Sequence, residues 1–251
     1  MNKNDLHTLS YSSSKIKDKT NKIYSQIINQ SKIIDKGNFT RIETSDMKLL
    51  FSLYDQHYFQ GFFNDNYKNK IFFRLSKQMT SAGGKTQRFI DSDKFILSLS
   101  TFLIFKTYND IKREIKINGI ICHDRLEASM RIFEHEIIHV IEHILYGTSS
   151  CSKPSFKRLS KNIFDHTAVT HRLITQNEIA AKTFDLHVGD FASFNYEGEF
   201  YKGIINRITK RATVMVKDSK GDYLDTKGNK YLKYYIPISQ LKKVGKKQIL
   251  F

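Results

Sequence analysis

Apolar residues first recur at helical spacing after a long polar and basic start. Residues 1–38 are rich in Lys, Asn and Ser, which favours a flexible basic arm that contains one helix around residues 16–34. From Thr44 onward, apolar residues recur every three or four positions until Gly61 interrupts the pattern. This spacing predicts an amphipathic helix that begins at a Thr44 or Ser45 cap.

The pattern changes to short β-prone runs after Lys70. The runs KIFFRLS, KTQRFID and KFILSLS are separated by turn residues, and they predict an antiparallel meander. The turn SAGGKT is close to a phosphate-binding loop, but that motif needs a glycine where Met79 stands. We therefore interpret it as a hairpin turn. The next run, TFLIFKTYNDIKREI, predicts another helix.

The segment between Asp124 and Gly147 predicts one long helix. Asp124 is a suitable N-cap, Gly147 is a suitable residue after the last turn, and neither Pro nor Gly lies between them. At about 100° per residue, His135 and His139 fall opposite the apolar stripe. The stripe consists of Leu126, Met130, Phe133, Ile137, Ile141 and Ile144.

The last part of the chain has the alternation of strands. Two further helical runs, KPSFKRLSKNIF and TQNEIAAKTF, precede it, and several short strands with turn residues follow Leu186. We expect an α+β fold: a flexible arm over residues 1–38, a mixed domain of helices and a small antiparallel sheet over 39–184, and a small Tudor-like β-barrel with a basic tail over 185–251.

Composition places this chain among folded proteins. It has 251 residues, of which 40% are hydrophobic, enough for a packed core. No run approaches the roughly 18 apolar residues of a membrane span, and the N-terminus lacks the apolar stretch of a signal peptide. We expect an intracellular location without membrane contact. Cys122 and Cys151 cannot form a disulfide framework, so they are interpreted as thiols or metal ligands.

The charge balance favours a polyanionic partner. Lys and Arg number 41 against 25 Asp and Glu, a formal net charge of +16, which favours DNA through counterion release. Compositional drift toward Lys would give the same excess. The C-terminal strands interleave cations with tyrosines, so they could contact nucleic acid, bind protein, or expose only a solvated basic face. The candidate nucleic-acid contacts are Arg207, Lys210, Arg211, Lys230 and Lys233.

The long helix carries an H-E-x-x-H motif that predicts a metal site. His135 and His139 are four positions apart, so their imidazoles share one helical face and can reach one ion. Two imidazoles suit Zn²⁺, which lowers the pKa of a bound water toward 7. Glu136 is close enough to take a proton from that water. An accidental polar face is the alternative.

The third ligand is less constrained by the pattern. His143 lies two turns from His135, about 12 Å along the helix axis, which is too far to share one ion. A catalytic zinc usually takes its third ligand from a separate element. Cys151 lies just beyond the helix and can supply a thiolate, and His166 and His171 are the rival candidates.

Several segments together resemble the SprT-like zinc metallopeptidases, the group that includes Spartan-type proteases acting on DNA–protein crosslinks. The segments are LYDQHYFQGFF, RLSKQMTSAGGKTQR, FEHEIIHVIEH and SKPSFKRLSKNIFDHTAVTH, in this order, within residues 39–173. The resemblance implies a zincin-like fold, zinc on His135 and His139, and Glu136 as general base. Many members end in a four-Cys zinc ribbon, whereas this sequence has the β-rich segment there.

One position departs from the family pattern. The family takes its third ligand from a His in an H-G-x-x-F context, and here Cys151 and Ser152 precede Phe156. Cys151 is the better zinc ligand of the two. A thiolate would put more charge on the zinc and make its water less acidic, which allows weakened catalysis.

The sequence thus predicts an intracellular zinc metalloendopeptidase whose substrates, by resemblance, are DNA-bound proteins. We expect a substrate-binding edge strand within residues 94–100. The alternatives are a non-catalytic zinc-containing factor that binds DNA or protein, and a peptidase-like regulator that cleaves one dedicated partner.

Overall fold

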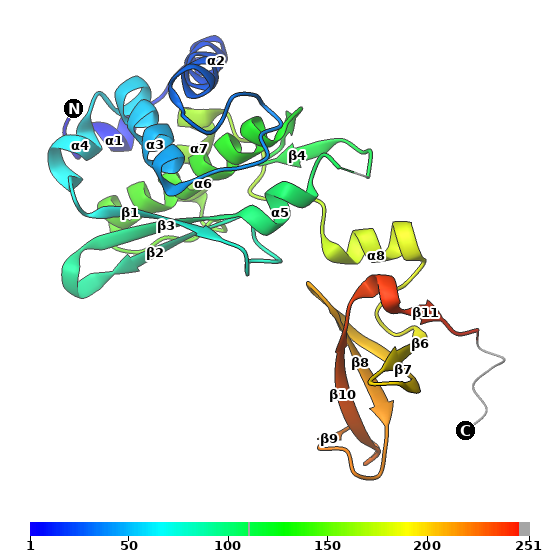
Figure 1. Ribbon diagram of the computed structural model, residues 1–251. Coiled ribbons are helices and arrows are strands. Elements are labelled where there is room, and N and C mark those ends of the chain that lie inside the picture. Colours follow the sequence, from blue (N-terminus) through cyan, green and yellow to red (C-terminus); the bar gives the residue numbers. More distant parts are fainter. Residues whose placement is uncertain (110, 246–251) are drawn as a thin grey trace. The chain divides into compact units, whose positions relative to one another are not determined.

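The computed structural model describes residues 1–109 and 111–245 (Figure 1). The end of the basic tail, residues 246–251, lies outside this part. The chain divides into two units, residues 1–173 and 174–251, which are described separately. This boundary precedes the expected one because helix α8 (Gln176–Phe184) packs against strand β7 and the short helix η2 (Ile238–Gln240) of the second unit.

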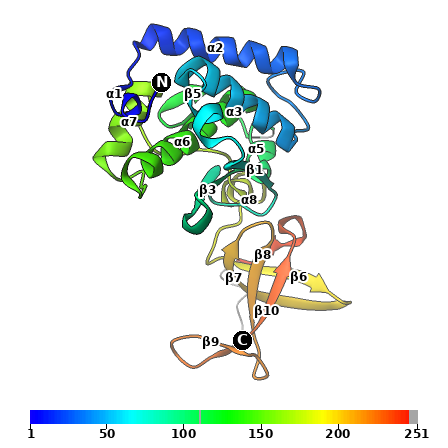
Figure 2. The same cartoon turned by 90° about the vertical axis from the view of Figure 1, so that its left-hand side faces the viewer.

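The N-terminal residues are helical rather than a flexible arm. Helices α1 (Asp5–Thr8) and α2 (Ser13–Gln30) are formed, and α2 lies on the outer side of α3 (Thr44–Phe59), as Figure 2 shows. Helix α2 corresponds to the helix expected around residues 16–34, but the arm around it is not flexible, because α2 has one buried stripe, formed by Ile16, Thr20, Ile23 and Ile27.

Helix α3 confirms the first predicted helix, with its cap one residue earlier. Glu43 is the N-cap, and its side chain and that of Asp46 form a reciprocal capping box. Gln60 takes the left-handed conformation after the last turn, and Gly61 then starts the short helix α4 (Phe62–Tyr67).

The three predicted strands form one sheet, but not a meander. The order is β1 (Ile71–Ser76), β3 (Lys94–Ser100), β2 (Gly84–Phe89), with β1 parallel and β2 antiparallel to β3. Strand β3 takes the centre because its alternate residues Phe95, Leu97 and Leu99 are almost fully buried. The turn η1 (Ile90–Ser92) connects β2 to β3, and helices lie on one side of the sheet (Figure 1).

Helix α6 (Arg125–Tyr146) is the central element of the first unit. Asp124 accepts a hydrogen bond from the Glu127 N–H, and Gly147 takes the left-handed conformation, so both predicted ends are confirmed. The helix packs on β2, β3 and α7 (Pro154–Phe164). Nearly all its faces are buried, so the polar side opposite the apolar stripe also lies inside the protein.

The segment before α6 differs from the predicted helix. Helix α5 (Thr101–Lys106) is short, and a hairpin of β4 (Ile115–Ile117) and β5 (Ile120–Cys122) follows. The hairpin turn is Asn118-Gly119, with both residues at positive φ, as this dipeptide favours.

The second unit is an antiparallel sheet around its own core. Its order is β11-β6-β7-β8-β10-β9, which agrees with the β-rich segment expected in this part of the chain. A bulge in β7 between Ile205 and Arg207 bends the sheet around a core that includes Ala180 of α8. The strands are β6 (Phe191–Tyr196), β7 (Glu199–Ile208), β8 (Ala212–Lys217), β9 (Tyr223–Leu224), β10 (Lys230–Ile236) and β11 (Lys242–Lys243).

The predicted α+β fold is confirmed, with a mixed helical and β first unit followed by a β-rich one. Among the helices of the described chain, none combines the length and apolar character needed to cross a membrane.

Candidate metal centre

Two histidines of α6 and one cysteine from the following loop come together in the first unit. One nitrogen each of His135 and His139 and the Cys151 sulfur all lie within 4.8 Å of one another. Within the described residues, this is the group of His, Cys, Asp or Glu side chains close enough to hold one ion. Phe156 of α7 packs against both imidazoles, with ring centroids 4.7 and 4.6 Å away.

The second nitrogen of each imidazole is held by a separate polar group. His139 Nδ1 lies 2.6 Å from the Ser149 hydroxyl, which donates to the buried Glu142 carboxylate at 2.7 Å. His135 Nδ1 lies 3.2 Å from Asn118 Oδ1, and the amide nitrogen of Asn118 donates to the Arg131 carbonyl. Both Nδ1 atoms therefore face acceptors and carry the proton.

This arrangement leaves two unprotonated nitrogens facing one another. His135 Nε2 and His139 Nε2 are 3.1 Å apart, and each carries a lone pair when its Nδ1 is protonated. Burial lowers the pKa of His135 to about 2 and that of His139 to about 4, so both rings are neutral near pH 7. A cation between them would remove the repulsion. The donor set, two imidazoles and a thiol, fits Zn²⁺.

Glu136 points from α6 toward strand β2. The Thr86 hydroxyl of β2 donates to Glu136 Oε2 at 2.7 Å, and the carboxyl group is almost fully buried. Burial raises the pKa of Glu136 to about 8, with the Thr86 hydrogen bond opposing part of that rise. A carboxyl group poised this close to neutrality can accept and return a proton.

A cavity of about 390 Å³ opens onto the same residues. Gly84, Lys85 and Thr86 of β2 line it together with His135, Glu136 and His139, so the strand edge, the motif and solvent meet here. His143 also lines this cavity, but its Nδ1 faces the Gly147 carbonyl at 3.4 Å. It lies outside the three-residue cluster, as helix geometry predicted.

The two rival third ligands have different surroundings. His166 Nε2 lies 2.8 Å from a Glu134 carboxylate oxygen, inside a buried network with Arg131 and Tyr54. Because His166 Nε2 contacts Glu134, it is not directed at the cluster of His135, His139 and Cys151. His171 packs its ring 4.8 Å from that of His135 and lines the cavity, and its Nε2 has no hydrogen-bond partner among the described residues.

The five proposed nucleic-acid contacts do not gather into one patch. Arg207, Lys210 and Arg211 surround the β7–β8 turn, where Ala212 pairs with Ile236 at the end of β10. Lys230 lies at the opposite end of β10, about 20 Å away at 3.4 Å per residue. Lys233 is half-buried, with its ammonium 3.4 Å from the centre of the Tyr223 ring.

Sequence reasoning missed the residues that orient the imidazoles and the Glu136 carboxyl group. Asn118, Ser149, Glu142 and Thr86 are polar side chains whose roles depend on contacts between separate elements. One signal was present for Asn118, since Asn-Gly is a strong turn dipeptide and fixes where that amide can lie.

Comparison with known protein families gives one match. The model of the SprT-like family matches residues 47–178, which include the strands of the first sheet, the H-E-x-x-H motif and Cys151. No curated protein sequence and no solved structure matches this chain.

Proposed function

This chain belongs to the SprT-like family, whose fold is that of a metallopeptidase, and we propose that it is a zinc-dependent endopeptidase acting on DNA-associated proteins inside the cell. The observation that carries the proposal is the opposed pair of Nε2 atoms on His135 and His139, with Cys151 beside them and Glu136 lining the same cavity. Metal donors, a proton acceptor and an open cavity then meet at one place, as peptide hydrolysis requires.

The metal would be held by His135, His139 and Cys151. When bound there, Zn²⁺ would supply Lewis acidity, which polarises a peptide carbonyl and makes water a better nucleophile near neutral pH. Asn118 and Ser149 keep the Nδ1 protons in place, so both Nε2 lone pairs would be available to the metal.

Glu136 would move the protons of the reaction. Its carboxylate accepts a proton from the attacking water and returns it to the departing amine nitrogen. Thr86 holds the carboxylate through its hydroxyl, on the wall of the cavity where the substrate carbonyl would lie. Burial helps the first of these transfers, because it stabilises the protonated form of the carboxyl group.

Strand β2, not residues 94–100, offers the edge for an extended substrate. Residues 94–100 form β3, which is the central strand and has partners on both sides. Strand β2 pairs with β3 alone, and the Ser100 N–H donates to the Gly83 carbonyl. The alternation of an antiparallel ladder then turns the N–H and C=O of Gly84, Thr86 and Arg88 outward. A peptide added at this edge would pass over the cavity.

A DNA-associated substrate is favoured by charge. The formal net charge of +16 draws the protein to polyanions, and Lys85 lines the candidate active-site cavity itself. The exposed cations at the β7–β8 turn, Arg207 and Arg211, would add contacts to phosphate. DNA would then raise the local concentration of enzyme and DNA-bound substrate on the same molecule.

The alternative is a non-catalytic factor that keeps a structural zinc and binds DNA or protein. Cys151 is the observation in its favour, because a thiolate ligand lowers the positive charge available to activate water. This alternative predicts one tightly bound zinc and no proteolysis under any DNA condition.

The test is cleavage of a histone by the zinc-loaded protein, alone and with single-stranded or double-stranded DNA, followed by gel electrophoresis. We expect cleavage that DNA accelerates and that 1,10-phenanthroline abolishes. DNA affinity measured alongside should fall steeply as salt rises. A fully zinc-loaded protein that leaves the histone intact with every DNA would favour the non-catalytic alternative. Affinity that does not change with salt would contradict the electrostatic argument.

A further inference from the structure

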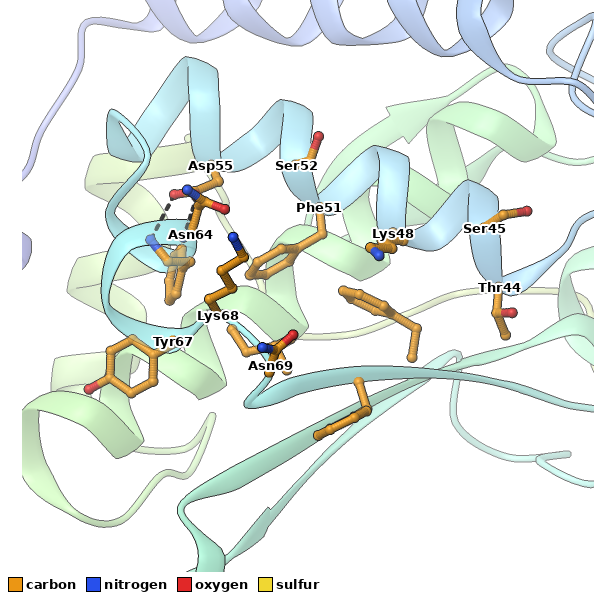
Figure 3. A pocket seen from close by; sticks show the side chains of 14 residues that line it. Thr44, Ser45, Lys48, Phe51, Ser52, Asp55, Asn64, Tyr67, Lys68 and Asn69 are labelled. Atoms are coloured by element: carbon orange, nitrogen blue, oxygen red, sulfur yellow. Dashed lines mark hydrogen bonds between the residues drawn. The ribbon is translucent and has the colours of Figure 1, made fainter.

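A second groove lies in the first unit between helix α3 and strand β1. It has a volume of about 690 Å³, and Figure 3 shows the side chains that line it, with the Phe51 ring extending from α3 toward the strand. Residues of α3 at positions 44, 45, 48, 51, 52 and 55 line it, a spacing that follows one stripe of the helix. Its floor is apolar, with Phe51, Phe63 and Phe73 in ring contact at 5.2 and 5.5 Å.

Strand β1 presents an unpaired edge to this groove. In the part of the chain that the structure describes, β1 pairs with β3 and with no other strand. The Phe95 N–H donates to the Lys70 carbonyl, and Ile71 is in register with Phe95. In a parallel ladder, the N–H and C=O of Ile71 and Phe73 must therefore point away from β3. Such an edge is a template for another extended chain.

The groove is cationic at its rim. Lys48 of α3 and Lys68 after α4 are exposed and reach toward the space between helix and strand (Figure 3). The acidic lining residue, Asp55, is already engaged, since its carboxylate accepts the N–H groups of Phe63 and Asn64 at the start of α4. The two ammonium groups are thus not neutralised by this carboxylate, and they favour an anionic occupant.

The length of the groove fits a short peptide. Thr44 and Asp55 are eleven positions apart, which at 1.5 Å per residue gives about 16 Å of helix. An extended peptide rises about 3.3 Å per residue, so roughly five residues span the groove. We propose that this groove docks an extended acidic segment of a partner protein, which pairs with β1, places alternate apolar side chains on Phe51 and Phe73, and meets Lys48 and Lys68 with carboxylates.

This docking surface is separate from the candidate active site. The groove borders β1, whereas the cavity with Glu136 borders β2, and β3 lies between these two strands. A partner held at β1 would leave the β2 edge open. Its binding is therefore independent of zinc and of Glu136, and the docking can be tested even if the protein cleaves nothing.

The test uses a fluorescein-labelled heptapeptide, Asp-Val-Glu-Phe-Asp-Val-Glu, and fluorescence anisotropy with the full chain. We expect saturable binding that a double variant, Lys48→Glu with Lys68→Glu, weakens at least tenfold. The matched control is Lys17→Glu, an exposed lysine on α2 outside the groove, which should bind as the wild type does. A peptide with Lys in place of its acidic residues should prefer the double variant.

Backbone pairing has its own readout. Hydrogen exchange with the peptide bound should slow at the amides of Ile71 and Phe73, while a peptide N-methylated at alternate residues should bind more weakly. Equal affinity for the double variant and the wild type would overturn the proposal, as would the absence of binding at millimolar peptide. An all-Glu peptide that binds equally well, or displacement by oligothymidylate with the same dependence on Lys48 and Lys68, would assign the groove to polyanions instead.

Discussion

The side chains around the two imidazoles decide what the candidate site can bind. His139 depends on a relay in which its Nδ1 proton meets Ser149, and Ser149 in turn meets the buried Glu142. His135 depends on Asn118, whose amide is anchored to a backbone carbonyl. Groups of this kind fix the tautomer and direction of a metal ligand.

Removing the relay hydroxyl should therefore weaken metal binding without unfolding the protein. We expect Ser149→Ala to lower zinc affinity about 10- to 100-fold, because His139 loses its orienting acceptor. Ser152→Ala is the control, since Ser152 is exposed and contacts Ser150 rather than an imidazole. Zinc competition with a chromophoric chelator measures the effect. Equal affinities for the two variants would show that Ser149 does not orient His139.

The third ligand can be identified by comparing three substitutions. Zinc content after dialysis should fall sharply in Cys151→Ala, because only two imidazoles would remain. His143→Ala should keep its zinc. His166→Ala should also keep zinc while losing stability, since Glu134 would lose a buried partner. Loss of zinc in His166→Ala alone would overturn the assignment of Cys151.

Glu136 should make the metal-free protein less stable as pH rises. Its pKa in the folded protein is about 8, above the usual value for glutamate, so folding favours the protonated form. Between these two values the folded state holds a proton that the unfolded state has lost, and stability falls by about 1 kcal/mol per pH unit.

Glu136→Gln removes this penalty. The metal-free variant should therefore melt at a higher temperature than the metal-free wild type, and this difference in melting temperature should increase from pH 5 to pH 8. Calorimetry in the presence of a chelator measures it. Glu114→Gln, at an exposed glutamate of the same unit, is the control for the chemical change itself. A difference that stays constant over this pH range would contradict the burial of a titrating carboxyl group.

At the scale of elements, the site depends on how closely β2 approaches α6. A Cβ added at Gly84 would lie 2.5 Å from Glu136 Oε1 and 2.7 Å from Ile132 Cγ2. At Gly83 it would lie 2.9 Å from another Ile132 atom. The glycine pair in SAGGKT thus serves close packing of strand on helix rather than phosphate binding.

Gly84→Ala should push β2 away from α6. We expect a loss of about 1–3 kcal/mol of unfolding free energy, the usual cost of an overpacked contact, measured by urea denaturation. Gly245→Ala makes the same chemical change where no atom lies within 4 Å, and it should be neutral. An equally neutral Gly84→Ala would contradict the inference that β2 packs tightly on α6 at this position.

The sequence predicted elements well where the signal is local. Helix α6 begins and ends at the predicted residues because Asp124 and Gly147 act through their own backbone and side chains. The order of the sheet could not be predicted, since the pairing of β1 with β3 is decided by burial of Phe95 and Leu97 against distant helices. Long-range contacts of this kind leave little trace in periodicity.

The candidate site likewise has features that local sequence predicts and features that depend on long-range contacts. Helix spacing is enough to pair His135 with His139 and to exclude His143. The orienting residues Asn118 and Ser149 come from separate loops, so only the fold brings them to the imidazoles. The α2 segment shows the same limit, because its helix was predicted whereas the packing of its buried stripe on α3 was not.

At the scale of the whole molecule, different tasks fall to different surfaces. The first unit carries the candidate metal centre beside β2 and the peptide groove beside β1. The second unit carries a separate core and a basic β7–β8 turn. The proposals together describe a protein that holds DNA, a partner and a substrate on separate surfaces. The role of the substrate surface requires that the metal centre hydrolyses peptides.

That condition is tested most directly by measuring zinc content and histone cleavage on the same preparations of wild type and Glu136→Gln. Glutamine keeps the size of the side chain and leaves the cluster of His135, His139 and Cys151 untouched. We predict about one zinc per chain in both proteins, as expected for one such ligand set, and cleavage by the wild type only. Cleavage by Glu136→Gln at the wild-type rate would contradict the account.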